Sequence, residues 1–351
     1  MADPPLVASS WLIGWALCLA ASLLLVGCSG NAGDSSTQSG SAAGGFPLTI
    51  TNCGHELHFD KAPERTVSLN QSSTEIQLSL GVADTMVGTA TWTDPVLSSL
   101  EAENDEVPRL ADNNASFETV LAASPDFVSA SFPNTLDDTG SGSYASYANL
   151  GVPAYLAPNQ CEKGDGGDGD SERSEVLAMD DIYQEIDDLA AIHGVPDKGN
   201  ELVDSLRGRL DAAVSGANVD GGEVSAAFWF ANSESPYVAG GTGASQMISN
   251  DLEVTNVYSD DAKEWPQVSW EDLAAKNPDV LVLGDLTRKS QTAETAQAKI
   301  DYLRSNPVTA QMGAVRNDRF IIVAGGDMNP SIRTVDLAEK IGAGLKQYGL
   351  R

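Results

Sequence analysis

A thirteen-residue phrase occurs twice in this chain, at residues 116–128 and again at residues 269–281. The copies, SFETVLAASPDFV and SWEDLAAKNPDVL, share five identical residues, and their aromatic and several aliphatic positions match in kind. A supersecondary unit that returns at domain-sized spacing predicts two lobes built on one plan. The alternative is a chance similarity between two well-capped helix starts.

Each copy predicts a helix, a turn and a strand. Ser116 and Ser269 are suited to be N-caps, because a serine hydroxyl accepts a hydrogen bond from a free N–H of the first turn. The glutamate two positions later, Glu118 or Glu271, lies where the helix dipole favours an anion. A proline–aspartate pair then ends the helix, and a β-rich run follows at once. We therefore expect an α/β lobe around each copy.

The N-terminal segment has the pattern of a processing signal. Residues 11–26 are apolar, and the small residues before Cys28 resemble a bacterial lipoprotein cleavage site. This predicts a signal peptide over residues 1–27, lipidation of Cys28 and a Gly/Ser-rich flexible tether over residues 28–45. A plain signal peptide or a membrane helix is the alternative, although the apolar run is short for a span. The basic leader that usually precedes the apolar run is missing, because the first basic residue is Lys61.

The composition restricts the kinds of partner that the chain can bind. Its 351 residues are enough for two domains. Fifty acidic residues against twenty Lys and Arg give a net charge of −30. Nucleic acid is disfavoured as a ligand, because phosphate contacts need clustered basic residues. The excess of acid predicts a well-solvated exterior, and we expect a monomer.

The four cysteines divide into two pairs. Cys18 lies in the leader and Cys28 at the lipidation site. Cys53 and Cys161 remain, and in an exported chain an even pair favours a disulfide. We expect no metal site at this pair, because no further Cys or His lies at ligand spacing.

Strands alternate with helices along the rest of the chain, which predicts mainly parallel, covered sheets. We expect an N-terminal lobe over residues 46–171, a connecting helix over residues 172–194 and a C-terminal lobe over residues 195–351. The connecting helix is indicated by Ile182, Ile186 and Leu189 at helical spacing. The Gly/Asp-rich stretch 161–171 predicts an acidic loop, since its carboxylate spacing does not match a calcium loop.

Several motifs in order resemble the bacterial solute-binding lipoproteins that serve ABC importers of ferric siderophores, cobalamin and haem, the class III periplasmic binding proteins. They are the cleavage site at Cys28, PERTVSL at 63–69, TEIQLSLG at 74–81, both repeat copies, WPQVSWE at 265–271 and the stretch 306–320. The resemblance covers roughly residues 47–350. It implies two Rossmann-like α/β lobes with mainly parallel sheets, joined by a single long rigid α-helix.

The resemblance also implies roles. One glutamate of each lobe, Glu118 or Glu271, would dock onto arginines of an ABC permease, which works with ATPase subunits. The alternative is that both only satisfy the helix dipole. The lipid anchor would hold the protein on the extracytoplasmic face of the cell membrane, in the periplasm or at the cell surface.

The ligand is expected at the carboxyl ends of the strands, in the cleft between the lobes. Aromatic side chains would pack on a bulky ligand, and Arg333 could meet an anionic chelate. The alternative for Arg333, which begins a helix, is a surface position or a salt bridge within its own lobe. For each aromatic residue, packing in the core is the alternative. The candidate ligand-binding residues are Asn70, Trp92, Phe132, Trp229, Tyr237, Trp265, Met328 and Arg333.

A ferric siderophore is the leading ligand, with the iron arriving as a chelate and no cofactor of the protein's own. Cobalamin is an alternative with the same fold. Haem is a third and needs an axial His or Tyr, for which the candidates are His55, His58, His193, Tyr144, Tyr147 and Tyr155. An α/β enzyme is the remote alternative, because no catalytic triad, phosphate loop or metal cluster is apparent.

Overall fold

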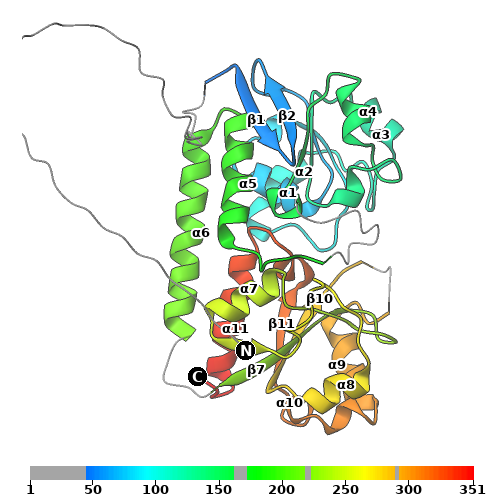
Figure 1. Ribbon diagram of the computed structural model, residues 1–351, viewed down its shortest axis with the longest axis vertical. Coiled ribbons are helices and arrows are strands. Elements are labelled where there is room, and N and C mark those ends of the chain that lie inside the picture. Colours follow the sequence, from blue (N-terminus) through cyan, green and yellow to red (C-terminus); the bar gives the residue numbers. More distant parts are fainter. Residues whose placement is uncertain (1–44, 162–171, 218–222, 289–291) are drawn as a thin grey trace, which may run out of the picture. The chain divides into compact units, whose positions relative to one another are not determined.

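The computed structural model describes residues 45–161, 172–217, 223–288 and 292–351. Within them two parallel sheets form the cores of two α/β lobes (Figure 1). The chain order is β1 Leu48–Asn52, β2 His55–Phe59, β3 Thr66–Ser68, α1 Gln71–Ser79, β4 Met86–Thr89, α2 Glu101–Asp105, α3 Phe117–Ala122, β5 Phe127–Ala130, α4 Tyr144–Ala148, β6 Ala154–Leu156, α5 Met179–Ile192, α6 Pro196–Ala217, β7 Val224–Ala231, β8 Tyr237–Val238, α7 Ala244–Asp251, β9 Val254–Asn256, α8 Trp270–Lys276, β10 Val280–Asp285, α9 Ala296–Ser305, α10 Gly313–Arg316, β11 Phe320–Ala324 and α11 Thr334–Gln347.

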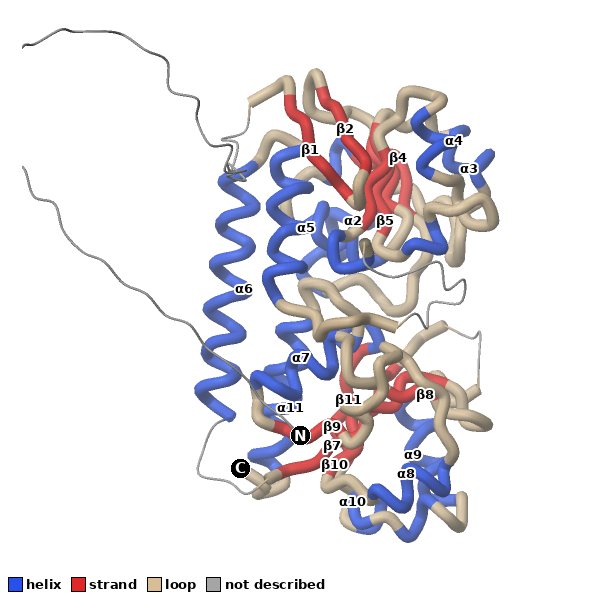
Figure 2. The backbone as a smooth tube through the Cα atoms, in the orientation of Figure 1, coloured by secondary structure: helices blue, strands red, loops and turns tan. Residues whose placement is uncertain are grey.

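The first lobe is built on a four-stranded sheet in the order β4-β3-β5-β6, with every pairing parallel (Figure 2). Its strands are buried along their length, as strands covered on both faces are. The antiparallel hairpin β1–β2 comes before this sheet. The hairpin turn is tied to the end of the lobe by a disulfide between Cys53 and Cys161.

The second lobe has a five-stranded sheet in which β10 lies between β11 and β7, and β7 also pairs with β8 and β9. All of these pairings are parallel except β7 with β8. β7 and β10 are almost continuous apolar runs, VSAAFWFA and VLVLGD, and they form the centre of the sheet. The expectation of two α/β lobes with mainly parallel sheets is therefore confirmed.

The repeated phrase forms the same unit in each lobe. The Ser116 hydroxyl accepts a hydrogen bond from the Thr119 N–H (3.2 Å) at the start of α3, and Ser269 accepts one from the Asp272 N–H (3.1 Å) at the start of α8. Both helices end before the proline, and β5 and β10 follow within a few residues. The predicted helix, turn and strand are thus confirmed in both copies.

The prediction of a connecting helix over residues 172–194 is corrected by the structure. α5 begins only at Met179. Ile182, Ile186 and Leu189 pack in a hydrophobic cluster that is mainly of the first lobe but also includes Met247, Ile332 and Val335 of the second. Residues 172–178 are not helical, because their backbone pairs with the second lobe: Glu172 bridges to Lys263, and the Leu177 N–H donates to the Thr242 carbonyl (3.0 Å).

α6, the longest of the described helices, contacts both lobes. Its 22 residues span about 33 Å. It lies beside α5 (Figure 1) and packs against α11 of the second lobe. Arg209 of α6 bonds to Asp336 (2.5 Å) and to Glu339 (2.7 Å) of α11. A single long helix between the lobes is therefore present, but it begins where the predicted one ends.

The signal peptide, the lipidation site Cys28, the tether as far as Gly44 and most of the acidic loop lie outside the described residues. Among the helices of the described part, none has the length and apolar character needed to cross a membrane.

Candidate functional site

A cavity of about 600 Å³ lies where the loops of the two lobes meet. Most of its wall comes from the first lobe, from the segments after β4 and before α3. The second lobe contributes the two residues that follow Leu286, beyond the end of β10. The lining residues are Trp92, Thr93, Asp94, Pro95, Arg109, Asp112, Asn113, Thr287 and Arg288. The cavity thus lies at the carboxyl ends of parallel strands, where the alternation of strands and helices predicts a ligand.

Each lobe contributes one arginine that lies over an aromatic ring. The Arg109 guanidinium is 4.4 Å from the centre of the Trp92 ring, and its Nη1 is 3.1 Å from Asp112 Oδ1. Arg288 lies 5.1 Å from the centre of Phe230, and its Nε is 3.3 Å from the Glu294 carboxylate. These contacts orient two planar hydrogen-bond donors at the cavity, one from each lobe.

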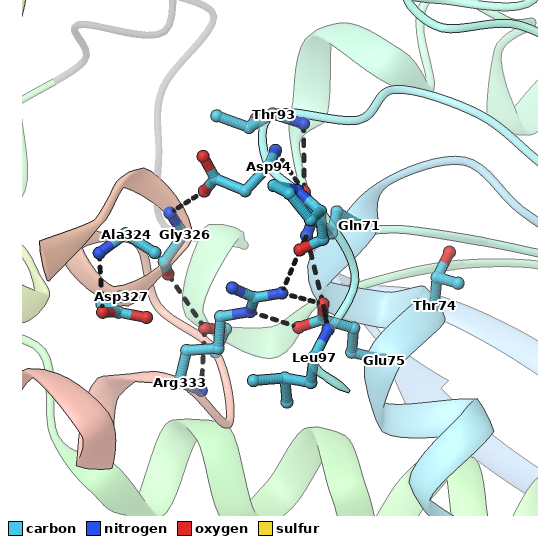
Figure 3. Close-up of polar contacts among 12 residues, drawn as sticks. Gln71, Thr74, Glu75, Thr93, Asp94, Leu97, Ala324, Gly326, Asp327 and Arg333 are labelled. Carbon is cyan, nitrogen blue, oxygen red and sulfur yellow. Dashed lines mark hydrogen bonds and ion pairs between the residues drawn. The ribbon is translucent and has the colours of Figure 1, made fainter. Parts of the chain in front are cut away.

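Beside the cavity, polar contacts join the lobes directly (Figure 3). The Arg333 Nε donates to Glu75 Oε2 (2.7 Å), and Arg333 Nη2 donates to Glu75 Oε1, so the pair is bidentate. Glu75 belongs to α1 of the first lobe, and Arg333 comes just before α11 of the second. Both side chains are buried. Arg333 also lines a smaller hollow together with Phe132, Gln71 and Asn329.

Asp94 is the titratable group of the cavity wall whose environment is most unusual. Burial raises the pKa of its carboxyl to about 6, an effect that the Gly326 N–H and the charge of Arg333 only partly offset. Its Oδ2 accepts a hydrogen bond from the Gly326 N–H (2.5 Å) across the lobe boundary. Asp94 is therefore mostly ionised at pH 7 and gains a proton as the pH falls through about 6.

The structure brings three of the predicted ligand-binding residues to these hollows. Trp92 lines the large cavity, and Phe132 and Arg333 line the smaller one. Thr93 lines both, so the two hollows adjoin. Arg333 is already engaged by Glu75 of the other lobe in a buried ion pair, whereas its predicted alternative was a surface position or a salt bridge within its own lobe.

Three other candidates are structural, which corrects their prediction as ligand contacts. Trp229 is 1% exposed, packs against Trp270 and donates from its indole N–H to the Ala231 carbonyl (2.9 Å). Met328 is wholly buried in the core of the second lobe. Asn70 is buried and accepts a hydrogen bond from the Ser131 N–H (2.7 Å), which joins the ends of β3 and β5.

Tyr237 and Trp265 are half-buried and line neither hollow. Tyr237 pairs through its backbone with Ala231, and the Trp265 ring packs on Phe230 at 4.8 Å. Trp265 therefore supports the ring over which Arg288 lies.

The sequence is similar to known proteins over most of its length. Residues 66–324, which are 259 of the 351 residues, match the model of the periplasmic binding protein family. The chain belongs to this family. Its members bind solutes and are not enzymes, so this periplasmic binding protein is an extracytoplasmic solute-binding protein.

Two curated relatives and one solved structure show what the chain is similar to. YvrC, an ABC transporter substrate-binding lipoprotein of Bacillus subtilis, is 24% identical over 77% of this chain and 80% of the relative. The vitamin B12-binding protein of Vibrio cholerae is 26% identical over 81% and 89%. The ABC-type Fe3+-hydroxamate transport system of Saccharomonospora viridis is 26% identical, with a TM-score of 0.70 and coverage of 86% of this chain and 99% of the other.

The docking candidates of this periplasmic binding protein lie at equivalent places in the two lobes. Glu118 is in the first turn of α3 and Glu271 in the first turn of α8, and both side chains are exposed. No ion pair holds either of them among the residues that the structure describes. Both carboxylates are thus available to a partner, as the predicted role requires.

The histidine and tyrosine candidates for haem ligation lie away from the cavity wall. His55 stacks on Tyr144 at 4.2 Å, and His58 is exposed on the hairpin. His193 is buried against Phe127, and burial lowers its pKa to about 4. Tyr147 and Tyr155 are buried and donate to the Ser141 carbonyl and the Asp188 carboxylate (2.5 and 2.9 Å).

The sequence reasoning missed both arginines of the cavity. Arg109 and Arg288 belong to no motif and follow no periodic pattern. One sequence signal could have found them. Basic residues are scarce in this chain, so an arginine in a loop after a predicted strand is a candidate ligand contact.

Proposed function

We propose that the chain is the substrate-binding component of an ABC importer and that it captures a ferric siderophore in the cavity between its lobes. It then delivers the chelate to the permease, which works with ATPase subunits. The observation that carries this proposal is the cavity itself, with one ring-backed arginine from each lobe at its wall. A volume of about 600 Å³ lies within the range of small-molecule sites.

The chemistry of the wall suits a metal chelate. The Trp92 ring is 8% exposed and lies under the Arg109 guanidinium, so it mainly supports that arginine at the wall and adds only a small apolar surface of its own. Arg109 and Arg288 cannot ligate a metal, but they donate hydrogen bonds to oxygen atoms, in which siderophore chelates are rich. Phe132 contributes a second ring at the adjoining hollow. The wall therefore recognises the outside of a chelate and leaves the coordination of the iron to the chelator.

Two relatives bear on the choice of ligand, and each supports a different candidate. The similarity to the Fe3+-hydroxamate transport system supports a ferric siderophore. The similarity to the vitamin B12-binding protein, over 292 residues, supports cobalamin as the second candidate. Haem is the weaker alternative, because the cavity wall of the described chain contains no His, Tyr, Cys or Met to serve as an axial ligand.

The repeated phrase supports an ABC permease as the delivery partner. Glu118 and Glu271 are exposed at equivalent helix starts, so a permease with a matching pair of arginines would be held at two points. Lipidation at Cys28 and the tether that follows would keep a monomer near that permease on the outer face of the cell membrane.

Titration of the mature protein tests the ligand. Ferrichrome, ferric enterobactin, cyanocobalamin and haemin would be added while tryptophan fluorescence is followed. We expect quenching by a ferric chelate at low concentration, and a much smaller signal in Trp92→Phe. Saturable binding of cyanocobalamin alone would select the second candidate, and haemin alone the third.

Arginine variants test the place of binding. Arg109→Ala and Arg288→Ala should each weaken binding by roughly tenfold to a hundredfold, because each loses hydrogen bonds from a charged donor. Arg304→Ala is the matched control, since Arg304 also lies over a ring, Phe320, and pairs with a carboxylate, Asp318, at the surface. Equal affinity in all three variants would exclude this cavity.

A further inference from the structure

Three consecutive residues of the first lobe, Thr93 to Pro95, are bonded to the second lobe. We call this segment the strap. The Thr93 carbonyl accepts from Thr287 Oγ1 (3.2 Å), Asp94 Oδ2 from the Gly326 N–H (2.5 Å), and the Pro95 carbonyl from Arg333 Nη2 (2.7 Å). Each contact reaches a different segment of the second lobe, so the strap is a concentrated point of attachment between the lobes.

The same strap is held from behind by α1 of its own lobe. Gln71 Oε1 accepts from the N–H groups of Thr93 (3.0 Å) and Asp94 (3.1 Å), and its Nε2 donates to the Pro95 carbonyl (3.3 Å). Glu75 Oε1 accepts from the Leu97 N–H (3.1 Å), just after the strap. Figure 3 shows Gln71, Glu75 and Arg333 converging on this segment.

The ion pair of Glu75 with Arg333 is the centre of this network. Its side chains are 1% and 6% exposed, so water has little access to either charge. A buried charge that loses its partner is strongly destabilising, which makes the pair an all-or-none contact. The fit around it is close: a Cβ at Gly326 would lie 3.2 Å from Arg333 Cδ and 3.3 Å from Asp94 Oδ2.

The strap is also part of the ligand wall. Thr93, Asp94 and Pro95 line the large cavity, and Trp92 directly precedes them. The strap atoms that join the lobes therefore belong to the surface that would contact the ligand. A shift of the strap would change the contact between the lobes and the shape of the cavity together.

We infer that Glu75 and Arg333 are positioning residues: they clamp the strap against the second lobe and so fix the shape of the ligand cavity. The part of this inference that concerns ligand affinity rests on the proposed function. Arg333 then acts through Glu75 and Pro95 and does not contact the ligand. The competing role is that Arg333 binds an anionic ligand, for which Glu75 substitutes when the site is empty.

Hydrogen–deuterium exchange without any ligand tests the clamp directly. The variants are Glu75→Gln, Arg333→Gln and the double variant, in which two neutral amides can pair. We expect faster exchange at the amides of Thr93, Asp94, Leu97 and Gly326 in each single variant, and partial recovery in the double variant. Arg209→Ala, which removes both ion pairs between α6 and α11, is the control that should leave these amides unchanged.

Affinity measurements separate the two roles of Arg333. The probes are ferrichrome, an uncharged ferric trihydroxamate, and ferric enterobactin, a strongly anionic tricatecholate. If the clamp sets the cavity, each single variant weakens the binding of both probes by roughly 5- to 150-fold, and the double variant is weakened less than the two effects combined. Tighter binding of ferric enterobactin alone by Glu75→Gln would overturn the inference, because it would show that Arg333 had been released for an anion.

The binding measurements and the exchange measurements can each refute a different claim. A wild-type protein that binds no ferric chelate, cobalamin or haemin would refute the proposed function, and the exchange data would still decide whether the clamp exists. Unchanged exchange at the strap in folded Glu75→Gln would refute the clamp, whatever the protein binds. Circular dichroism of each variant confirms that the compared proteins are folded.

Discussion

Cys53, in the turn between β1 and β2, is bonded to Cys161 at the end of the first lobe, with the two Cα atoms 4.9 Å apart. The two residues are separated by 108 positions in the sequence. The bond therefore closes a loop that contains nearly all of the first lobe, including its four-stranded sheet.

We predict that replacing both cysteines by serine lowers the free energy of unfolding by about 4 kcal/mol, because the unfolded chain regains the freedom of a long loop. Guanidinium unfolding of the oxidised wild type and of the double variant measures the difference. Reductant should destabilise the wild type and leave the double variant unchanged. Equal midpoints for oxidised and reduced wild type would contradict the prediction.

The repeat leads to a prediction about transport. Glu118→Ala and Glu271→Ala should each reduce uptake of the ligand in cells, and the double variant should reduce it most, while the affinity of the purified protein stays the same. The physical reason is that the two exposed carboxylates lie outside the cavity and are free to meet a charged partner.

Glu103→Ala is the matched control for that experiment. Glu103 is also an exposed glutamate in a first helical turn, that of α2, but it belongs to no repeat copy. Full uptake by Glu118→Ala with Glu271→Ala would assign both glutamates to the helix dipole alone.

His193 should make the protein less stable in mild acid. Burial lowers its pKa from 6.5 to about 4 in the folded state, and its Nε2 lies 3.2 Å from Gln77 Oε1. Between these two values the unfolded chain binds the proton and the folded chain does not, so stability falls as the pH falls through this range. This residue should account for a loss of about 2 kcal/mol between pH 7 and pH 5.

The comparison of His193→Gln with the wild type isolates that contribution. The variant should lose less stability than the wild type over this range, measured by urea unfolding at each pH. His58→Gln, at an exposed histidine of β2, is the control and should keep the wild-type pH dependence. Parallel pH profiles for all three proteins would refute the assignment.

Glu185 should act in the opposite direction. It is wholly buried on α5, neither of its carboxylate oxygens has a hydrogen-bond partner among the described residues, and burial raises its pKa from 4.5 to about 8. The folded state keeps a proton that the unfolded state has released, so the stability that Glu185 contributes at low pH is lost as the pH rises from about 4.5 to about 8.

We therefore expect Glu185→Gln, which imitates the protonated acid, to gain stability over the wild type by up to about 3 kcal/mol more at pH 8 than at pH 5. Thermal unfolding at the two pH values measures this difference. Glu103→Gln, at an exposed site, should show no such change. A gain of the same size at both pH values would mean that Glu185 stays ionised in the folded protein.

Much of the local structure could be predicted from the residues. The caps Ser116 and Ser269 and the strands β5 and β10 that follow the two helices all appear where their patterns indicate. Such features depend on interactions between residues a few positions apart, which a sequence displays directly.

The binding surface was less predictable. Trp92 follows β4 and Trp229 lies within β7, near its end; Trp92 lines the cavity, whereas Trp229 fills the core. The sequence does not distinguish them, because burial depends on what the rest of the chain places over each ring. Arg109 and Arg288 were missed for the same reason: they come together only because two lobes meet there.

The sequence alone was thus sufficient to predict two α/β lobes, their repeated unit and the family of the chain. Only the tertiary structure shows that α6, and not α5, is the connecting helix. It also decides which residues face the cavity and that Glu75 pairs with Arg333. Glu75 and Arg333 are 258 positions apart in the sequence. Neither is recognisable as a partner until the packing of both lobes removes water from the pair and brings the two charges into contact.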